Sequence, residues 1–437
     1  MLVAIASIVA PGSLHSQEAI SFDELKVLLD KYFAPELVSD IEAALPKSPF
    51  DVWGFDAGDY SGDGFNDLIL QIRMRRDRGR RMMIYHFVDV EGILEVVREE
   101  AVDFIELPID VGVTIGDGTA YVLAKRDEKG WNFWGRRYRD GVIFLHDHRE
   151  TNASEAFQHE SYRNFETLSA VDRFLRTRNE QEVFRSDYLT VPSYRRGRHI
   201  SAGYARTATA RKAANILKGA YYIDGEEDLR VGVRSAWDHD FLYFNILVVD
   251  DKVEPRSDKV DSIGDRVEIW LDTYLKADRI TGGSKRGGFR LRSDSNIYGL
   301  YVDLCDVADR RPSVKIATTN LFDRSQNDAT RRIRGVASRT DSGWALAIRI
   351  PFALLGFSEA PVDRESLLEL GATIVVEDLD NKWRPEELSR VATSENFDHT
   401  KPATFGEVIM VPNSMHYGES ANIFLPQVQE RLEEIGL

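Results

Sequence analysis

The segment Arg266-Val-Glu-Ile-Trp-Leu-Asp272 alternates apolar and polar side chains with a period of two. Successive side chains of a β-strand point to opposite faces, so this period predicts a strand with one apolar and one polar face. The apolar face holds Val267, Ile269 and Leu271, and the polar face holds Glu268, Trp270 and Asp272. We therefore expect a strand that covers a hydrophobic core and carries an indole between two acids on its other side.

Four neighbouring segments have the same character, because they are rich in β-branched and aromatic residues and end in turn residues. They are residues 229–236, 241–249, 344–350 and 372–376. This density of strands predicts a β-sandwich over residues 219–415. Trp344 shares its face with Leu346, Ile348 and Ile350, so we expect its side chain in the core of that sandwich.

The order of motifs in this region resembles the family 9 carbohydrate-binding module and its DOMON-like relatives. The resemblance rests on Trp237 to Asp251, Gly264 to Asp272, Gly343 to Gly356 and Gly371 to Asp380. It implies a β-sandwich that binds a polysaccharide or other glycan, often with bound calcium. One aromatic of the family's sugar clamp is missing here, since Ser262, Ile263 and Gly264 stand in its place, and Phe397 is near the position of the other.

Two tryptophans are candidate platforms for a sugar ring, because an aromatic face complements the apolar face of a sugar. Trp270 lies on the polar face of its strand, and Trp383 follows an acidic loop. For Trp270 the alternative is that another element of the chain covers the ring.

Four acids of the same region could form a metal cluster, since calcium prefers carboxylate oxygens. These acids are Asp250, Asp251, Asp265 and Glu268. Solvated charges at the edge of a sheet explain them equally well.

The preceding half of the chain predicts a second β-rich domain over residues 50–185. Short apolar runs separated by glycine and charged turns support it, at 67–72, 82–87, 119–124 and 141–145. Residues 157–184 carry aromatic anchors and are expected to pack back on this domain. Residues 20–48 have apolar positions at helical spacing, which predicts a helical segment broken near Pro35.

The stretch from Asp59 to Asp67 has the oxygen-bearing side chains of a calcium loop. Asp59, Ser61, Asp63 and Asp67 occupy loop positions one, three, five and nine, and the carbonyl of Phe65 would supply position seven. We therefore expect bound calcium. The alternative is a hairpin turn rich in Asp and Gly that holds no metal. Leu70 stands where an EF-hand has its last acid, so a true EF-hand is not expected.

This loop also resembles the loop of FG-GAP/VCBS repeats, and the likeness extends over about Phe50 to Arg149. Asp59, Ser61, Asp63, Asp67 and Leu68 match that family's pattern. The resemblance implies a calcium ion that stabilises the domain and takes no part in catalysis.

Composition limits the classes of partner. The chain has 437 residues with 72 Asp and Glu against 56 Lys and Arg, a net charge of −16 that disfavours nucleic acid. The single cysteine, Cys305, cannot form an internal disulfide. Positive charge is concentrated in a turn at Arg73 to Arg81 and in a predicted linker at 186–218. An anionic partner is expected there if one exists, and a solvated turn is the alternative.

The first residues of the sequence predict export. Met1 to Ala10 form an apolar run that is too short for a membrane span, and we expect a signal peptide over residues 1–19. A buried N-terminal segment is the alternative. No later stretch predicts a membrane span. The expected location is extracytoplasmic: periplasm, cell surface or medium. Residues 416–437 are expected to form a tail with a short amphipathic helix.

The sequence as a whole predicts a mainly β, non-catalytic protein that binds carbohydrate or another surface partner and holds calcium. No nucleophile elbow, metalloprotease helix, phosphate loop or dinucleotide motif occurs in it. Because DOMON-like proteins include cytochromes, heme binding is an alternative, with Met410, Met415 and His239 as available ligands. An envelope scaffold without a small ligand is the other alternative.

Overall fold

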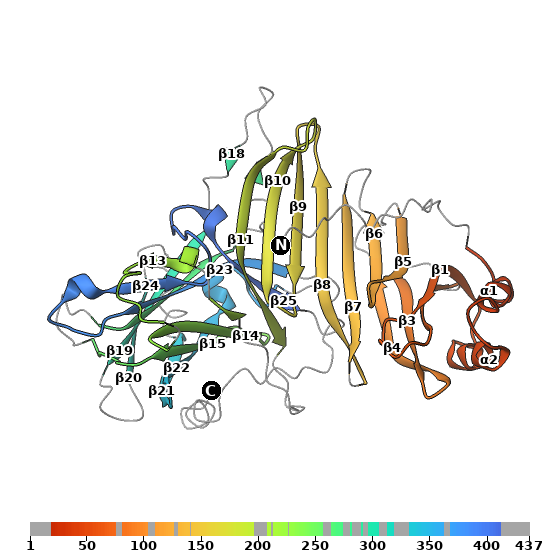
Figure 1. Ribbon diagram of the computed structural model, residues 1–437, viewed down its shortest axis with the longest axis horizontal. Helices are drawn as coiled ribbons and strands as arrows, with labels where there is room; N and C mark the ends of the chain where they lie inside the picture. The colour runs from red at the N-terminus through yellow and green to blue at the C-terminus, as the bar shows by residue number, and fades with distance from the viewer. Residues whose placement is uncertain are drawn as a thin grey trace. The chain divides into compact units, whose positions relative to one another are not determined.

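The computed structural model describes residues 19–75, 81–103, 110–125, 130–139, 141–195, 208–210, 213–225, 227–256, 264–273, 280–281, 290–291, 296–305, 313–318, 332–361 and 368–411. These residues form two compact units. The first unit holds the described residues up to Ser154 and Gln158–Tyr162, and the second holds Glu155–Phe157 and Arg163 onward. Each is built mainly of β-strands (Figure 1), which confirms the predicted fold class.

Two short helices open the first unit, α1 at Phe22–Leu29 and α2 at Pro35–Ala44. The Ser21 hydroxyl accepts the Glu24 backbone N–H at 3.3 Å, and the Glu24 carboxylate accepts the Ser21 N–H at 2.7 Å. This capping box satisfies N–H groups that a helix start leaves free. Pro35 is the first residue of α2, where a missing N–H has no cost. The predicted break at this proline is confirmed.

Two antiparallel sheets complete the first unit. The first sheet has the order β1 (Phe50–Gly58), β2 (Asp67–Met74), β3 (Arg81–Val90) and β4 (Ile93–Asp103). The second contains β5 (Asp110–Gly116), β6 (Thr119–Lys125), β7 (Trp131–Arg139) and β8 (Val142–Ala153). In β2, Leu68 and Leu70 pack with the helices, whereas Ile69 packs with Val122 of β6. Both faces of β2 are covered, which explains why Leu68, Ile69 and Leu70 are consecutive apolar residues.

The second unit is a β-sandwich made from one long series of paired strands. Its order is β21 (Arg334–Thr340), β22 (Gly343–Pro351), β15 (Phe241–Asp250), β14 (Leu229–Trp237), β11 (Glu182–Arg195), β25 (Glu407–Val411), β23 (Leu368–Asp378), β16 (Arg266–Asp272), β19 (Ile297–Cys305) and β20 (Ser313–Thr318). The strands that complete it are β10 (Ser169–Arg176), β12 (Ala208–Thr209), β13 (Ile216–Lys218) and β24 (Ser389–Ala392), with a small pair β17 (Ile280–Thr281) and β18 (Arg290–Leu291). Strand β9 (Phe157–Asn164) spans the division between the units.

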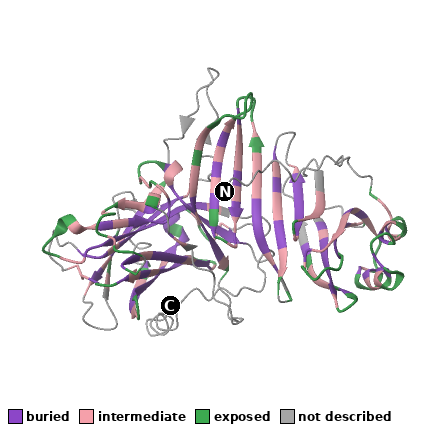
Figure 2. Cartoon of the chain, viewed as in Figure 1, coloured by how far each residue is buried: buried purple, intermediate pink, exposed green. Residues whose placement is uncertain are grey.

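The core of the second unit follows the predicted alternation. Val267, Ile269 and Leu271 of β16 face inward and join the largest hydrophobic cluster. Trp344 of β22 is in the same cluster and is only 1% exposed. Figure 2 shows the central strands of this unit as predominantly buried.

The boundary between the units differs from the predicted one. The segment 186–218, expected to be a linker, contains the second half of β11 together with β12 and β13, and these strands pair within the sandwich. Residues 163–185, expected with the first domain, belong to the second unit. An ion pair explains part of this placement, because the buried Arg163 guanidinium lies 2.9 Å from the Glu407 carboxylate of β25.

Candidate functional site

Three buried aspartates of the second unit bring their carboxylates together. Asp250 is the last residue of β15, Asp265 directly precedes β16, and Asp378 is the last residue of β23. One carboxylate oxygen from each lies within 4.8 Å of the other two. Antiparallel pairing of β16 with β23 places Asp265 beside Asp378. We call these three residues the inner acid group.

Hydrogen bonds hold two of these carboxylates in position. Asp265 accepts the backbone N–H groups of Glu254 at 2.8 Å and Leu379 at 3.1 Å. Asp250 accepts the N–H of Lys252 at 2.8 Å and the indole N–H of Trp344 at 3.3 Å. The third differs: Asp378 Oδ1 is buried and has no hydrogen-bond partner among the described residues. Such an oxygen is costly unless a ligand satisfies it.

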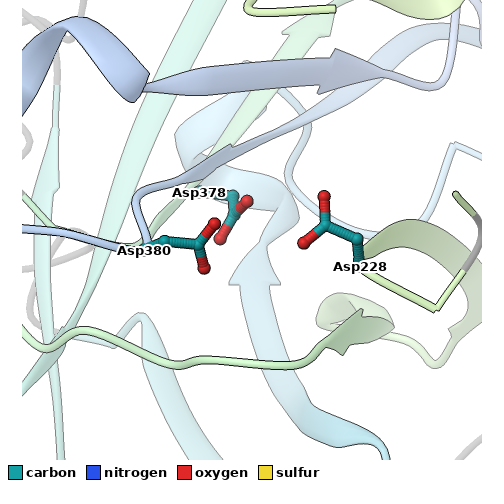
Figure 3. Close-up of side chains that lie close together, drawn as sticks. All are labelled: Asp228, Asp378 and Asp380. Atoms are coloured by element: carbon teal, nitrogen blue, oxygen red, sulfur yellow. The ribbon is translucent and has the colours of Figure 1, made fainter. Parts of the chain in front are cut away.

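Asp378 also belongs to a second set of three acids, shown in Figure 3. Asp228 comes from the segment that leads into β14, and Asp380 follows β23. The three carboxylates point toward one another, with one oxygen from each within 4.8 Å of the others. Asp228 accepts the backbone N–H of Asp224 at 2.7 Å. We call Asp228, Asp378 and Asp380 the outer acid group.

The acids raise one another's pKa values. Burial, followed by the charges of Asp250 and Asp380, raises the pKa of Asp378 to about 8. Burial raises the pKa of Asp250 to about 6, and burial and the Asp250 charge raise the pKa of Asp265. A bound cation would relieve the repulsion between these neighbouring carboxylates, because a cation favours the ionised form of each one.

The donor set fits calcium. Calcium takes six to eight oxygen ligands at irregular angles, and three carboxylates with backbone carbonyls or water can supply them. Among the described residues, neither group includes a cysteine or a histidine, so its side-chain donors are hard carboxylate oxygens. In the inner group, Asp250, Asp265 and Asp378 would hold the ion. A calcium ion bound there would neutralise the negative charge of these carboxylates.

The structure brings together only part of the acid cluster predicted from the sequence. Asp250 and Asp265 meet, as expected. Asp251 is exposed, and its charge acts on Asp228 and Asp380. Glu268 points to the other face of the sheet, where it accepts the Arg390 guanidinium at 2.8 Å.

Three acids of the two groups were not in the predicted cluster: Asp228, Asp378 and Asp380. Asp378 and Asp380 share one signal in the sequence, because both lie within four residues of the end of the predicted strand at 372–376.

Trp270 does not present a free ring in this structure. It is 3% exposed, and its indole N–H donates to the Glu268 carboxylate at 2.7 Å. Its ring stacks on His399 with centroids 4.6 Å apart. The expectation of an accessible platform on this strand face is therefore not met, because the segment after β24 covers it. The alternative stated from the sequence, a ring covered by the chain itself, describes what is seen.

The other two predicted ligand residues differ in exposure. Phe397 is half-buried, with its ring centroid 5.1 Å from that of Phe405 and 6.4 Å from that of Trp270. Trp383, in the loop between β23 and β24, is 82% exposed. Of the three, Trp383 has the most exposed side chain.

In the predicted calcium loop of the first unit, the carboxylates bind backbone N–H groups. Asp67 is buried and accepts the N–H groups of Tyr60 at 2.8 Å, Ser61 at 2.7 Å and Asp89 at 3.0 Å. Asp59 accepts from Gly62 and Gly64, and the exposed Asp63 accepts from Phe65. These bonds shape a tight turn, and calcium at Asp59, Ser61, Asp63, Phe65 and Asp67 stays a prediction.

The residues proposed as heme ligands are in unlike surroundings. Met410 is buried in the core of the second unit, whereas the His239 side chain is 69% exposed and lies 2.8 Å from Glu359. Met415 lies outside the described residues.

Several predicted features fall wholly or partly outside the described residues. These are the signal peptide at 1–19, residues 76–80 of the basic turn at Arg73 to Arg81, residues 196–207 and 211–212 of the linker predicted at 186–218, and the tail at 416–437. At the described start of the basic turn, Arg75 pairs with Asp51 at 2.7 Å. Within the described part of the chain, no helix is long and apolar enough to cross a membrane.

Comparisons with known proteins give structural neighbours only. No family model matches the sequence, and no curated protein matches it. A family 9 carbohydrate-binding module from Caldicellulosiruptor kristjanssonii, solved with cellotriose, has 16% identity and a TM-score of 0.32 and covers 54% of this chain and 98% of its own. The module from the same organism with glucose has 18% identity and a TM-score of 0.30, covering 52% and 98%. Similarity at this level does not assign the chain to a family, and no comparison supports the FG-GAP/VCBS resemblance.

Proposed function

We propose that the second unit is a non-catalytic carbohydrate-binding domain that holds calcium at the inner acid group and presents Trp383 to a sugar chain. The observation that carries the proposal is the 82% exposed indole of Trp383 on the loop that begins at the buried acids. An exposed tryptophan leaves a large apolar surface in water, and covering it with the apolar face of a sugar ring is favourable.

The polar groups around Trp383 suit the hydroxyls of a sugar. Its backbone N–H donates to the Asn381 side chain at 3.0 Å, which fixes the turn that displays the ring. Arg384 pairs with Glu387 at 2.8 Å on the following turn. The Lys382 ammonium lies 5.7 Å from the indole centroid. Amide, guanidinium and carboxylate groups beside an aromatic surface are the side chains that orient a polar ligand through hydrogen bonds.

Calcium at the inner acid group supports this display by stabilising the strand ends. Asp250, Asp265 and Asp378 end or precede three different strands, so an ion bound to all three ties them together. A ligand that binds only the folded protein raises its stability by mass action. The domain should therefore melt at a higher temperature with calcium than with chelator.

The sugar proposal is tested with a glycan array, followed by calorimetric titration of the strongest hit. Trp383→Ala should weaken binding at least about tenfold, which corresponds to about 1.4 kcal/mol. Tyr32→Ala is the matched control, because Tyr32 is an exposed ring (46%) in the first unit. Unchanged affinity in folded Trp383→Ala, or no glycan bound by the parent, would refute the proposal.

The heme alternative gains no support from the placement of Met410 and His239, which lie in different environments. A Soret band in the purified chain would favour it over the glycan proposal.

A further inference from the structure

Two loops of the second unit lie against each other at one end. The tyrosine loop comprises the described residues 219–225 and 227–228, and the tryptophan loop comprises residues 378–389. The Ser389 hydroxyl donates to the Gly219 carbonyl at 3.2 Å, next to the pairing of β13 with β24. Gly219 has a φ of +76°, and a Cβ there would lie 2.7 Å from the Leu388 carbonyl oxygen. The contact between the loops therefore requires glycine at this position.

These two loops carry the large exposed apolar side chains of the second unit. Among its described residues, those side chains are Tyr221 at 94% exposure, Tyr222 at 40% and Trp383 at 82%. The two tyrosine rings meet edge to face, with centroids 5.8 Å apart. Exposed rings gathered on neighbouring loops are typical of a binding surface.

The outer acid group links the same two loops at a second place. Asp228 ends the tyrosine loop, and Asp378 and Asp380 begin the tryptophan loop, with carboxylate oxygens within 4.8 Å (Figure 3). Without a cation, ionised carboxylates at this spacing repel one another across the two loops. A divalent cation between them reverses the sign of that interaction.

Two observations beyond the acids themselves point to a ligand there. Asp378 is 4% exposed, and its Oδ1 atom has no hydrogen-bond partner among the described residues. Oδ1 of the half-buried Asp380 is in the same condition. The Lys252 ammonium donates to the backbone carbonyl of Asp380. Because Asp378 has two oxygens, it can serve the inner and the outer group with one each.

We propose that a second calcium ion binds Asp228, Asp378 and Asp380 and joins the tyrosine and tryptophan loops, so that Tyr221, Tyr222 and Trp383 act as one platform whose sugar affinity depends on calcium. The cation site stands on the geometry of the acids. The dependence of sugar affinity rests on the proposed function as well.

The experiment uses the full chain and three variants. Asp228→Asn and Asp380→Asn each weaken the outer group and leave the inner group intact. Asp224→Asn is the matched control, because its exposed carboxylate lies on the tyrosine loop outside both groups. Calorimetry with calcium chloride should show one fewer bound ion in each test variant and no change in the control.

The surroundings of the Trp383 ring can be measured in the absence of sugar. Acrylamide quenching of Trp383 fluorescence is obtained by subtracting the signal of the Trp383→Phe variant from that of the parent protein. This quenching should change when calcium is added. The change should persist in Asp224→Asn and disappear in Asp228→Asn and Asp380→Asn. A full complement of ions and an unchanged calcium response in both test variants would overturn the cation site.

Cellotriose then tests the dependence of sugar affinity. Chelation should weaken its binding by a factor of about 5 to about 150, the usual range for coupled sites. Equal affinity with calcium and with chelator would overturn the dependence. If cellotriose binds neither with calcium nor with chelator, the proposed function fails for this ligand. The number of bound ions and the quenching of Trp383 then test the cation site independently of sugar binding.

Discussion

The indole of Trp270 stacks on the imidazole of His399, with ring centroids 4.6 Å apart and planes inclined by 26°. This stack closes the polar face of β16 to a ligand. Removing the imidazole should reopen it. We expect His399→Ala to make Trp270 more accessible to acrylamide. The quenching of Trp270 fluorescence in this variant is obtained by subtracting the signal of the double variant His399→Ala/Trp270→Phe. If quenching of Trp270 does not rise, His399 is not what covers the ring.

Trp344 and Trp383 should respond oppositely to truncation. Trp344 is 1% exposed in the core, so Trp344→Ala should lower the free energy of unfolding by about 3 to 5 kcal/mol. Trp383 is 82% exposed, so Trp383→Ala should change it by less than about 0.5 kcal/mol. Urea unfolding of both variants measures the difference. Equal losses would contradict their assignment to core and surface.

The turn at Asp59 to Asp67 allows structure and metal binding to be separated. Asp67→Asn replaces one acceptor oxygen by an NH₂ group among three backbone donors, so it should destabilise the first unit by about 1 to 3 kcal/mol with or without calcium. Asp63→Ala removes one exposed carboxylate, so it should abolish only the calcium-dependent part of the melting temperature. If excess calcium raises the melting temperature of Asp63→Ala as much as that of the parent, the loop binds no ion.

The first unit should lose stability in acid through a buried pair. His86 and Glu100 are 2.7 Å apart and buried. Burial lowers the pKa of His86, so the folded state resists its protonation. Burial alone would raise the pKa of Glu100, but Arg136, His86 and Arg98 outweigh it and hold that pKa below its usual value.

Both shifts have the same sign. A group whose folded pKa is lowered contributes stability that is present above its unfolded pKa and is lost as the pH falls. The melting temperature should therefore fall between pH 7 and pH 4. The fall should be smaller in His86→Gln, which removes the imidazole that acid must protonate, measured by thermal unfolding at several pH values. An identical pH profile in that variant would show that this pair does not control acid stability.

The strands could be predicted from the sequence because their information is local. Residues 266–272 were expected as a strand and form β16, and the alternation placed Val267 and Trp344 in the core. Period two identifies the face of Trp270 but not what lies on that face. His399 is far away in the chain, and only the folded loop brings it to the indole.

The acid groups show the same limit. Asp250 and Asp265 could be suspected, because each adjoins a predicted strand. Their meeting with Asp378 depends on the pairing of β16 with β23 and on the end of β15, which strand composition does not specify. The partition of the chain was misjudged for the same reason: nothing local in β11 shows that it pairs with β25.

The parallel pairing of β11 with β25 has a consequence for the order of events during synthesis. Tyr188 of β11 and Glu407 of β25 are hydrogen-bonded partners separated by 219 positions. A ribosome completes β11 long before β25, so the nascent sandwich carries an open strand edge during most of its translation. Unpaired edges invite pairing with other chains. Until β25 is synthesised, the growing chain therefore needs another group to cover this edge of β11.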